Sequence, residues 1–394
     1  MEQPFVVGKP VTGKYFIDRK SELKQLLALL SGTPKGDINN VILLGLRRTG
    51  KSSILLNAKK TLDKNKKIVP VIFDAYGIST KERFGRTFIS KVLQTYVEKS
   101  GERSYKERIK KLLEEKYEKL AERVSEFDVE FAEYIKFQIK LREPKVNEDE
   151  LLEAALQYPE KLGKDKGVYF VIMIDEFQEL LQWDKDFLKM FRRLVQAQKH
   201  VAYVLAGSAP TIMKQMVYDV SSPFYKQLTE IRVGKLSQES VSSFVQKRLK
   251  SVKISIDKKA LEVVFYLSHG FPDYVQRLGL QIFLRALESG KKQVEESDVQ
   301  VAYSEMILQL DPDFNNNFST FSPLEKEILI ALATGSKSPA EISSEIRKPM
   351  STLPKTLTRL MNQDVVEKYQ EAKYRITDPI LSDWLNRRYG QLTM

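Results

Sequence analysis

The 394-residue chain contains no cysteine and only two histidines, His200 and His269. The absence of cysteine excludes a disulfide framework and any metal site built on thiolates. The two histidines lie far apart in the sequence and do not provide the ligand set of a zinc site. We therefore interpret both as ordinary surface or half-buried residues.

The sequence also lacks long hydrophobic runs and an export signal. No apolar run approaches 18 residues, and the N-terminus lacks the basic-then-apolar order of a signal peptide. We therefore expect a cytoplasmic protein without a membrane partner. Positive charge is in excess, with 64 Lys and Arg against 52 Asp and Glu, or a formal net charge of +12. That balance favours an acidic partner such as nucleic acid, although many soluble proteins are merely basic.

A glycine-rich segment follows the first short apolar run of the chain. Val41 to Leu44 is continuously apolar, which is typical of a strand buried on both faces of a parallel sheet. Residues 45–52 then match G-x-x-x-x-G-K-[ST], and residues 53–62 have the pattern of an amphipathic helix. In such a loop the backbone N–H groups point at phosphate oxygens, Lys51 reaches the β and γ phosphates, and the Ser52 hydroxyl ligates Mg²⁺. The predicted nucleotide-binding residues are Gly45, Leu46, Arg47, Arg48, Thr49, Gly50, Lys51, Ser52 and Ser53.

A second apolar run, at 168–176, ends in two acids. Seven apolar residues precede Asp175 and Glu176. At the tip of a strand, Asp175 can hold the magnesium together with Ser52, and Glu176 can polarise the attacking water as general base. A strand that simply ends in surface acids is the alternative, but a phosphate loop upstream argues against it.

Further strands complete the expected sheet. Residues 201–206 predict a third strand, followed by Gly207 and Ser208. Ser208 would lie beside the γ-phosphate and sense it, although a plain turn also suits a Gly-Ser pair. With further strands at 68–73 and 230–233 and helices between them, we expect an α/β fold in which a parallel sheet is covered on both faces. The ligand belongs at the carboxyl ends of the strands.

Together, GLRRTGKSS, IDEFQEL and LAGS resemble the archaeal ATPase family within the AAA+/STAND group of P-loop proteins. The resemblance implies an ATPase that uses ATP and Mg²⁺. The segment YFIDRKSEL (15–23) is similar to the family's F-x-x-R-x-x-E-L segment, which lies near the adenine. By this resemblance, the candidates for contact with the base are Phe16, Ile17 and Arg19.

The segment HGFPDYVQRLG (269–279) resembles the family's G-x-P motif, which implies that Pro272 lies against the nucleotide. A plain helix–turn–helix joint predicts the same residues.

One departure from the family pattern concerns an arginine. Where relatives tend to read P-L-Y-G-R, this chain reads PFYKQ, so that Gln227 takes the place of the arginine and Lys226 lies beside it. If that arginine stabilises the transition state in relatives, its role here is unfilled or moved. Arg192 and Arg193 are candidates to act on a neighbouring subunit of a homo-oligomer. An arginine finger contributes about 10³–10⁵ in rate, so we expect slow intrinsic turnover.

Composition divides the rest of the chain into parts. We expect a P-loop core at 1–236 with a helical insertion at about 80–165, a helical lid at 237–310, a polar linker at 311–323 and a winged helix at 324–394. Within the insertion, residues 106–127 predict a charged helix that is either structural or a docking arm for a partner.

The C-terminal part has the pattern of a winged helix. Helices are expected at 324–335, 338–346 and 351–363, followed by a hairpin at 365–378. In such a domain, the second helix of the helix-turn-helix usually lies in the DNA major groove. The candidate DNA contacts are Lys355, Arg359, Lys373 and Arg375. Because winged helices also mediate protein contacts, two hypotheses remain. One is an ATP-driven switch that binds double-stranded DNA, and the other is a STAND-type signalling or defence ATPase with a protein partner.

Overall fold

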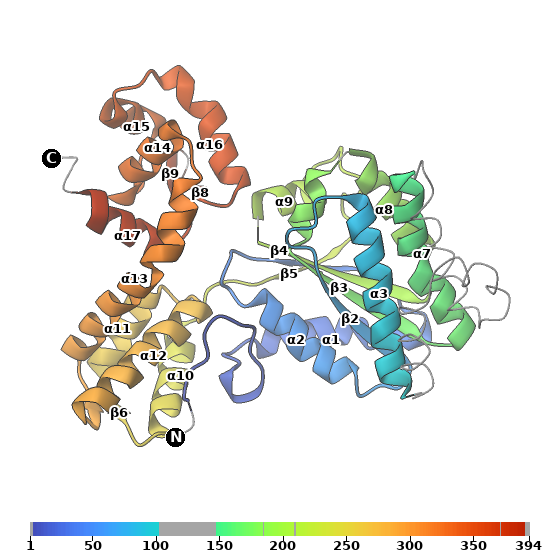
Figure 1. Ribbon diagram of the computed structural model, residues 1–394, viewed down its shortest axis with the longest axis horizontal. Coiled ribbons are helices and arrows are strands. Elements are labelled where there is room, and N and C mark those ends of the chain that lie inside the picture. Colours follow the sequence, from blue (N-terminus) through green and yellow to red (C-terminus); the bar gives the residue numbers. More distant parts are fainter. Residues whose placement is uncertain (1–2, 102–146, 184, 209, 371, 391–394) are drawn as a thin grey trace, which may run out of the picture.

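The computed structural model describes residues 3–101, 147–183, 185–208, 210–370 and 372–390. Figure 1 shows an α/β domain on one side of the molecule and, on the other side, a helical domain with a smaller C-terminal domain above it. The N-terminal residues run between the α/β domain and the helical domain. Within the described ranges, no helix has both the length and the apolar composition needed to cross a lipid bilayer.

The α/β domain is built on a five-stranded parallel sheet, as the apolar runs predicted. Its strands are β1 (Val41–Leu44), β2 (Ile68–Asp74), β3 (Tyr169–Asp175), β4 (Val201–Gly207) and β5 (Thr229–Arg232). They are ordered β2-β3-β4-β1-β5, and every neighbouring pair is parallel. All residues of β1 and β4 are buried, which explains why these strands appear in the sequence as continuous apolar runs.

Helices cover both faces of this sheet. One face carries α1 (Lys20–Leu30) and α2 (Lys51–Leu62), and the other carries α3 (Lys81–Ser100), α7 (Glu148–Lys166), α8 (Lys185–Ala197) and α9 (Pro210–Tyr218). Successive side chains of a strand point to opposite faces. Accordingly, Val41 and Leu43 join the core with α1 and α2, whereas Ile42 and Leu44 join the core on the other face.

The two ends of the expected insertion at 80–165 belong to the layer over the sheet. They form α3 and α7, which pack against each other and bury Phe84, Phe88 and Leu156 in the same core as the strands. The predicted charged helix at 106–127 lies outside the described residues, so its structural or docking role stays a prediction.

The helical domain consists of four helices and one pair of very short strands. These are α10 (Gln238–Lys250), α11 (Lys258–Ser268), α12 (Pro272–Ser289), α13 (Glu296–Ser319), β6 (Ser255–Ile256) and β7 (Gln293–Val294). Phe5 and Ile17 from the N-terminal segment are buried in the same core as these helices. The region expected to be a helical lid is therefore helical apart from the β6–β7 pair.

The predicted linker at 311–323 is wrong over most of its length, because α13 continues to Ser319. Polar residues and Pro312 suggested a break, but one side of this segment is apolar. Leu310, Phe314 and Phe318 follow one another at intervals of four residues and are all buried. Phe314 and Phe318 pack against the ring of Trp384 in the C-terminal domain. Burial of these aromatic rings outweighs the local cost of a proline inside the helix.

The C-terminal domain has the element order of a winged helix. It contains α14 (Pro323–Ala333), α15 (Pro339–Ile346), α16 (Leu353–Asn362), the antiparallel hairpin of β8 (Val366–Tyr369) and β9 (Lys373–Ile376), and α17 (Pro379–Tyr389). Ser338 caps α15 and Pro339 is its first residue, as the sequence predicted. Helix α17 was not predicted, and its Trp384 and Leu385 are buried in the core that this domain shares with the helical domain.

Candidate nucleotide-binding site

The phosphate loop connects the buried end of β1 to the first turn of α2. Its backbone needs glycine at two positions. A Cβ at Gly45 would lie 2.4 Å from the carbonyl oxygen of Val233, and Gly50 has a φ of +93°. Arg48 is also left-handed, with a φ of +63°. This conformation places the N-terminus of α2 and the loop N–H groups at the carboxyl edge of the sheet, where they can surround a phosphate.

Lys51 is held inside the loop that it is expected to serve. Its side chain is buried, and its ammonium donates hydrogen bonds to the carbonyl oxygens of Gly45 and Leu46, both at 2.8 Å. Burial lowers the pKa of Lys51 to about 8, although Glu176 and Asp175 oppose the shift. A phosphate bound to the loop would provide a stronger, charged acceptor for this ammonium.

Asp175 and Ser52 face each other across the site, as the two motifs predicted. Asp175 ends β3, lies opposite Asp74 of β2 in the sheet register and is buried. Burial raises the pKa of Asp175, while a hydrogen bond from the Ser52 side chain lowers it. A serine hydroxyl and a carboxylate are oxygen donors of the kind that Mg²⁺ prefers, so this pair fits the expected metal.

Glu176 lies directly against Ser208. The Ser208 hydroxyl donates to Oε2 of Glu176 at 2.8 Å, and the side-chain amide of Gln178 donates to the same oxygen. Gln178 is buried and also accepts a hydrogen bond from the backbone N–H of Ser208 at 3.1 Å. Sequence reasoning brought Glu176 and Ser208 to the same end of the sheet but missed Gln178, whose only signal is its place two residues after Glu176.

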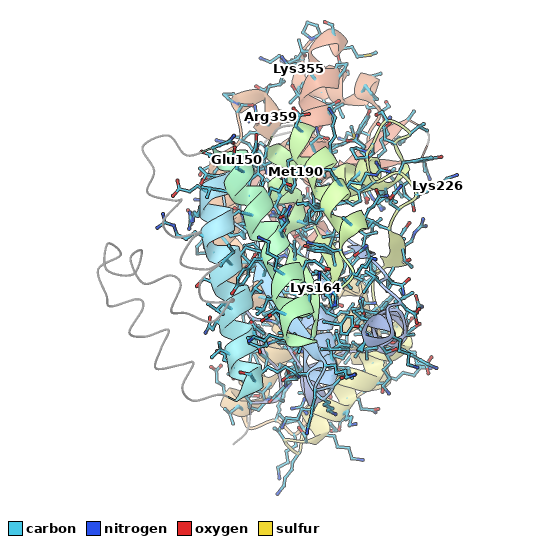
Figure 2. The ribbon with its side chains drawn as sticks, turned by 90° about the vertical axis from the view of Figure 1, so that its right-hand side faces the viewer. Glu150, Lys164, Met190, Lys226, Lys355 and Arg359 are labelled. Carbon is cyan, nitrogen blue, oxygen red and sulfur yellow. The ribbon has the colours of Figure 1, made fainter. Side chains whose placement is uncertain are left out.

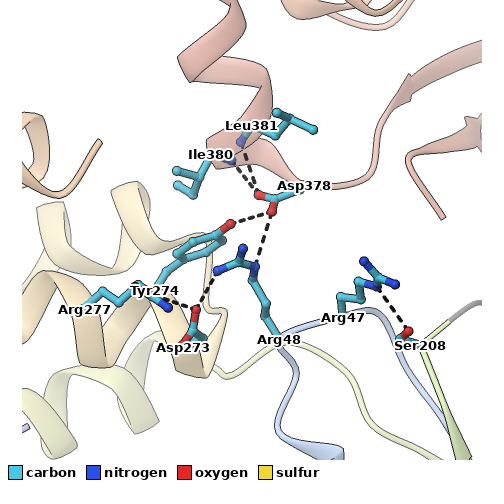
Figure 3. A network of polar contacts seen from close by, with 9 residues as sticks. All are labelled: Arg47, Arg48, Ser208, Asp273, Tyr274, Arg277, Asp378, Ile380 and Leu381. Atoms are coloured by element: carbon cyan, nitrogen blue, oxygen red, sulfur yellow. Dashed lines mark hydrogen bonds and ion pairs between the residues drawn. The ribbon is translucent and has the colours of Figure 1, made fainter. Parts of the chain in front are cut away.

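The two loop arginines reach away from the loop in different directions (Figure 3). Arg47 donates to the Ser208 hydroxyl at 3.3 Å. Arg48 contacts Asp273 of α12 at 2.8 Å and Asp378, just before α17, at 3.6 Å. Burial opposes the charge of Arg48, but Tyr274, Asp378 and Asp273 together raise its pKa. Arg48 thus connects the phosphate loop to both the helical domain and the winged helix.

The predicted base-site residues line a cavity of about 310 Å³ beside the loop. Phe16, Ile17, Arg19 and Pro272 all contribute to it. Pro272 is the first residue of α12, and its ring lies 3.8 Å from where a Cβ on Gly50 would be. Arg19 also has a structural role, because its buried guanidinium donates to the carbonyl oxygens of Thr49 and Gly234.

The N-terminal segment forms another wall of this cavity and was not predicted. Val6 and residues 8–11 line the cavity, and two anchors hold the segment in place. Gln276 of α12 accepts from the N–H of Val6 at 3.0 Å and donates to Tyr15 O at 2.9 Å. The hydroxyl of Ser53, in α2, accepts from the N–H of Val11 at 3.1 Å. A cleft with apolar walls at one end and a phosphate loop at the other matches the shape and polarity of a nucleotide.

A family model for an ATPase domain found predominantly in Archaea matches residues 16–278, most of the chain. The chain belongs to this archaeal ATPase family. The match includes the phosphate loop, Asp175, Glu176, Ser208 and Pro272.

Relatives of this archaeal ATPase share its fold along nearly the whole chain. The solved Walker-type ATPase of Pyrococcus abyssi covers 97% of this chain and 99% of its own, with a TM-score of 0.68 at 18% identity. The ORC1 protein of Aeropyrum pernix, solved in complex with DNA, covers 96% and 94%, with a TM-score of 0.53 at 14% identity. An uncharacterized HTH-type transcriptional regulator of Methanocaldococcus jannaschii is 21% identical over 378 residues, which are 92% of this chain and 87% of its own. The fold is that of an AAA+-like ATPase.

The arginines considered as fingers lie away from the cavity of this archaeal ATPase. Arg192 and Arg193 are on α8, and Arg193 is paired with Glu153 of α7 at 2.8 Å. Gln227, which replaces the family arginine, accepts a hydrogen bond from Gln196 at 2.6 Å. Action of Arg192 or Arg193 on a neighbouring subunit stays a prediction, and for Arg193 it would require the ion pair with Glu153 to break.

Three of the four predicted DNA contacts are engaged within the winged helix. Arg359 pairs with Glu325 at 3.2 Å, Lys373 lies 3.9 Å from Glu341, and Arg375 pairs with Glu367. Lys355 is exposed and, within the described ranges, has no acidic partner within 4 Å. Figure 2 shows Lys355 and Arg359 at the end of the molecule that the winged helix forms, beyond α7 and α8.

Proposed function

We propose that this archaeal ATPase binds and hydrolyses ATP and that its nucleotide state controls a DNA-binding winged helix. The observation that carries this proposal is the position of Arg48. A residue of the phosphate loop is bonded to Asp273 in the helical domain and to Asp378 in the winged helix. A phosphate placed in the loop would therefore act on a residue that contacts all three parts.

Nucleotide binding would use the loop and the walls of the 310 Å³ cavity. The base would enter between Phe16, Ile17 and Pro272, and the phosphates would accept from the loop N–H groups and from Lys51. The donors Ser52 and Asp175 would hold Mg²⁺, which neutralises phosphate charge when bound. The expected specificity for ATP rests on the family to which the chain belongs.

Hydrolysis would use Glu176 as general base. The hydrogen bonds that its Oε2 accepts from Ser208 and Gln178 keep that oxygen occupied in the present arrangement. A proton from water could be accepted by the other oxygen, Oε1, or by Oε2 after one of these bonds breaks. Ser208 also accepts from Arg47, so a phosphate that attracts Arg47 would rearrange the contacts of Ser208 and, with them, the orientation of the base. This coupling ties turnover to the presence of the terminal phosphate.

DNA is the partner we favour for the winged helix. Support comes from the formal charge of +12, the exposed Lys355, the helix-turn-helix regulator among the relatives and the structural similarity to an ORC1 protein solved with DNA. Lys355 lies near the start of α16, the helix that a winged helix usually places in the major groove. Electrostatic attraction to backbone phosphates would supply much of the affinity.

A protein-partnered, STAND-type switch is the second candidate, and two observations favour it. Three of the four basic candidates already have acidic partners inside the domain. In addition, α16 packs against α9 of the α/β domain, so that part of its surface is covered. In this hypothesis, the docked winged helix inhibits the ATPase until a protein ligand displaces it.

The deciding experiment is ATP turnover with and without duplex DNA at fixed ionic strength, with Glu176→Gln as the blank. Removing a general base typically costs about 10²–10⁴ in rate, so the blank should retain nucleotide binding but lose turnover. Several-fold stimulation by DNA that fades with added salt would support the DNA-coupled switch. No response, together with tightly retained nucleotide, would favour the protein-partnered switch. Unchanged turnover in Glu176→Gln would refute the assigned base.

A further inference from the structure

Asp364 of the winged helix faces the phosphate loop across a cavity that Arg47, Arg48 and Ser208 also line. It lies in the turn between α16 and β8 and has a φ of +58°. The positive groups that act on its carboxylate are the Lys51 ammonium and the Arg47 guanidinium, and the backbone N–H of Arg47 also stabilises its charged form. Its Oδ2 is buried and accepts no hydrogen bond from the described residues. The turn thus presents a carboxylate to donors that a phosphate would use.

The position of Asp364 along the site follows from two adjoining cavities. The first, with the base-site residues, ends at Arg47, Arg48 and Ser208. The same three residues line a second cavity of about 360 Å³, whose other wall includes Asp364 and Asp378. A nucleotide with its base at Phe16 and Pro272 therefore extends its phosphate chain toward Asp364. The last phosphate of the chain is the one that would come nearest to it.

A carboxylate and a terminal phosphate cannot both occupy this place at low cost. Above the pKa of Asp364, which lies at about 7, both are anions. Like charges brought together in a partly buried site repel each other strongly. Both are also stabilised by the positive charges of Lys51 and Arg47. A diphosphate is shorter by one phosphate and leaves these positive charges to Asp364.

We infer that Asp364 is a specificity-determining residue that makes the docked winged helix selective for a nucleoside diphosphate over a triphosphate. In binding, the γ-phosphate competes with the Asp364 carboxylate for Lys51 and Arg47, so a triphosphate is accommodated only when the turn withdraws from the loop. This inference rests on the proposed nucleotide binding and adds which phosphate is recognised and by what. Asp378, which contacts Arg48 and also accepts a hydrogen bond from Tyr274, would separate from Arg48 in the same movement.

The test compares the affinities for ADP and for a non-hydrolysable ATP analogue at pH 8, where Asp364 is charged, both with Mg²⁺. The wild type should bind ADP about tenfold or more tightly than the analogue, a ratio that corresponds to about 1.4 kcal/mol. Asp364→Asn keeps the size of the side chain and suits the left-handed backbone, so it should fold normally. We expect it to lower the ratio to about twofold or less, mainly by improving binding of the analogue. Asp313→Asn, the same charge change at an exposed position of α13, should leave the ratio at the wild-type value.

A second readout follows the movement itself. Because the chain has no cysteine, labels can be placed at Lys189→Cys on α8 and Lys355→Cys on α16 without background. The analogue, but not ADP, should lengthen the distance between the labels. An unchanged ratio in Asp364→Asn, or an equal distance with both nucleotides, would overturn the inference. Failure of the wild type to bind either nucleotide would instead overturn the proposed function.

Discussion

The buried ammonium of Lys51 prepares the site to bind a phosphate. Its ammonium is buried, its pKa is lowered to about 8, and its hydrogen-bond partners are neutral carbonyl oxygens of its own loop. A buried cation with only neutral acceptors gains far more from a phosphate than an exposed lysine would. The loop is therefore stabilised by the ligand that it binds.

We expect Lys51→Ala to weaken nucleotide binding by about 100-fold or more, because a charge-assisted bond to phosphate in a buried site contributes about 3 kcal/mol. The fold should not be destabilised, since the substitution removes a buried charge. Titration with a fluorescent nucleotide measures the first effect and thermal unfolding the second. Lys64→Ala, an exposed lysine just after α2, serves as control and should bind like the wild type. Retained affinity in Lys51→Ala would contradict the assigned site.

Asp364 predicts a pH dependence of stability. Burial raises its pKa from 3.8 to about 7, against the opposing effects of Lys51 and Arg47, and Glu367 raises it further. Because the folded-state pKa lies above the unfolded one, the neutral carboxyl stabilises the fold fully below about pH 4, and this contribution is lost as the pH rises through 7. Asp364→Asn should therefore gain stability relative to the wild type over that range, by at most about 1.4 kcal/mol per pH unit.

The measurement is chemical unfolding at pH 5 and pH 8 in a Trp183→Phe background, where Trp384 is the remaining tryptophan and reports on the winged helix. The stability difference between Asp364→Asn and its parent should be larger at pH 8. The stability difference between Asp313→Asn and its parent should be the same at both pH values. A stability difference of equal size at both pH values would show that burial does not raise the pKa of Asp364 in the folded state.

Residues inside continuous motifs were predictable, and residues that act across the fold were not. The loop, Asp175 and Glu176 follow from short patterns whose chemistry requires that order. Three residues contribute to the site through partners 30 or more positions away in the sequence. They are Gln178, Gln276 and Asp364. Their places depend on how the domains pack, which no local pattern encodes.

At the scale of elements, the sheet was the easiest part to predict because its strands are buried on both faces. β5 begins at Thr229, one residue before the predicted strand, and the other strands begin within a residue of their apolar runs. The segment 311–323 failed because polar residues and Pro312 outnumber the apolar ones. The interval of four between Leu310, Phe314 and Phe318 was the signal that a helix continues there.

The continuity of α13 can be tested by limited proteolysis with chymotrypsin. A linker would expose Phe314 and Phe318 to cleavage, whereas both are buried in the helix. We therefore expect the native protein to resist cleavage at these two positions at protease levels that cut the heat-denatured chain there. Early cleavage after Phe314 in the native protein would instead support the linker predicted from the sequence.

At the scale of the molecule, Arg48 is a residue that contacts all three parts. Arg48→Ala removes the bonds to Asp273 and Asp378 together. We expect a wider distribution of distances between labels on Lys189→Cys and Lys355→Cys, measured without nucleotide. Arg277→Ala is a matched control, because Arg277 pairs with the same Asp273 at 2.9 Å from within α12. An identical distribution in both variants would mean that Arg48 does not hold the winged helix in place.

Helix α13 has a mechanical consequence. Its 24 residues correspond to a rod of about 36 Å that begins in the helical domain and ends against α17 of the winged helix. If the rod tilts by about 10° at its first turn, its far end sweeps through about 6 Å, which is more than one helical turn. A small tilt of α13 would therefore be enlarged at the winged helix, where α16 contacts α9.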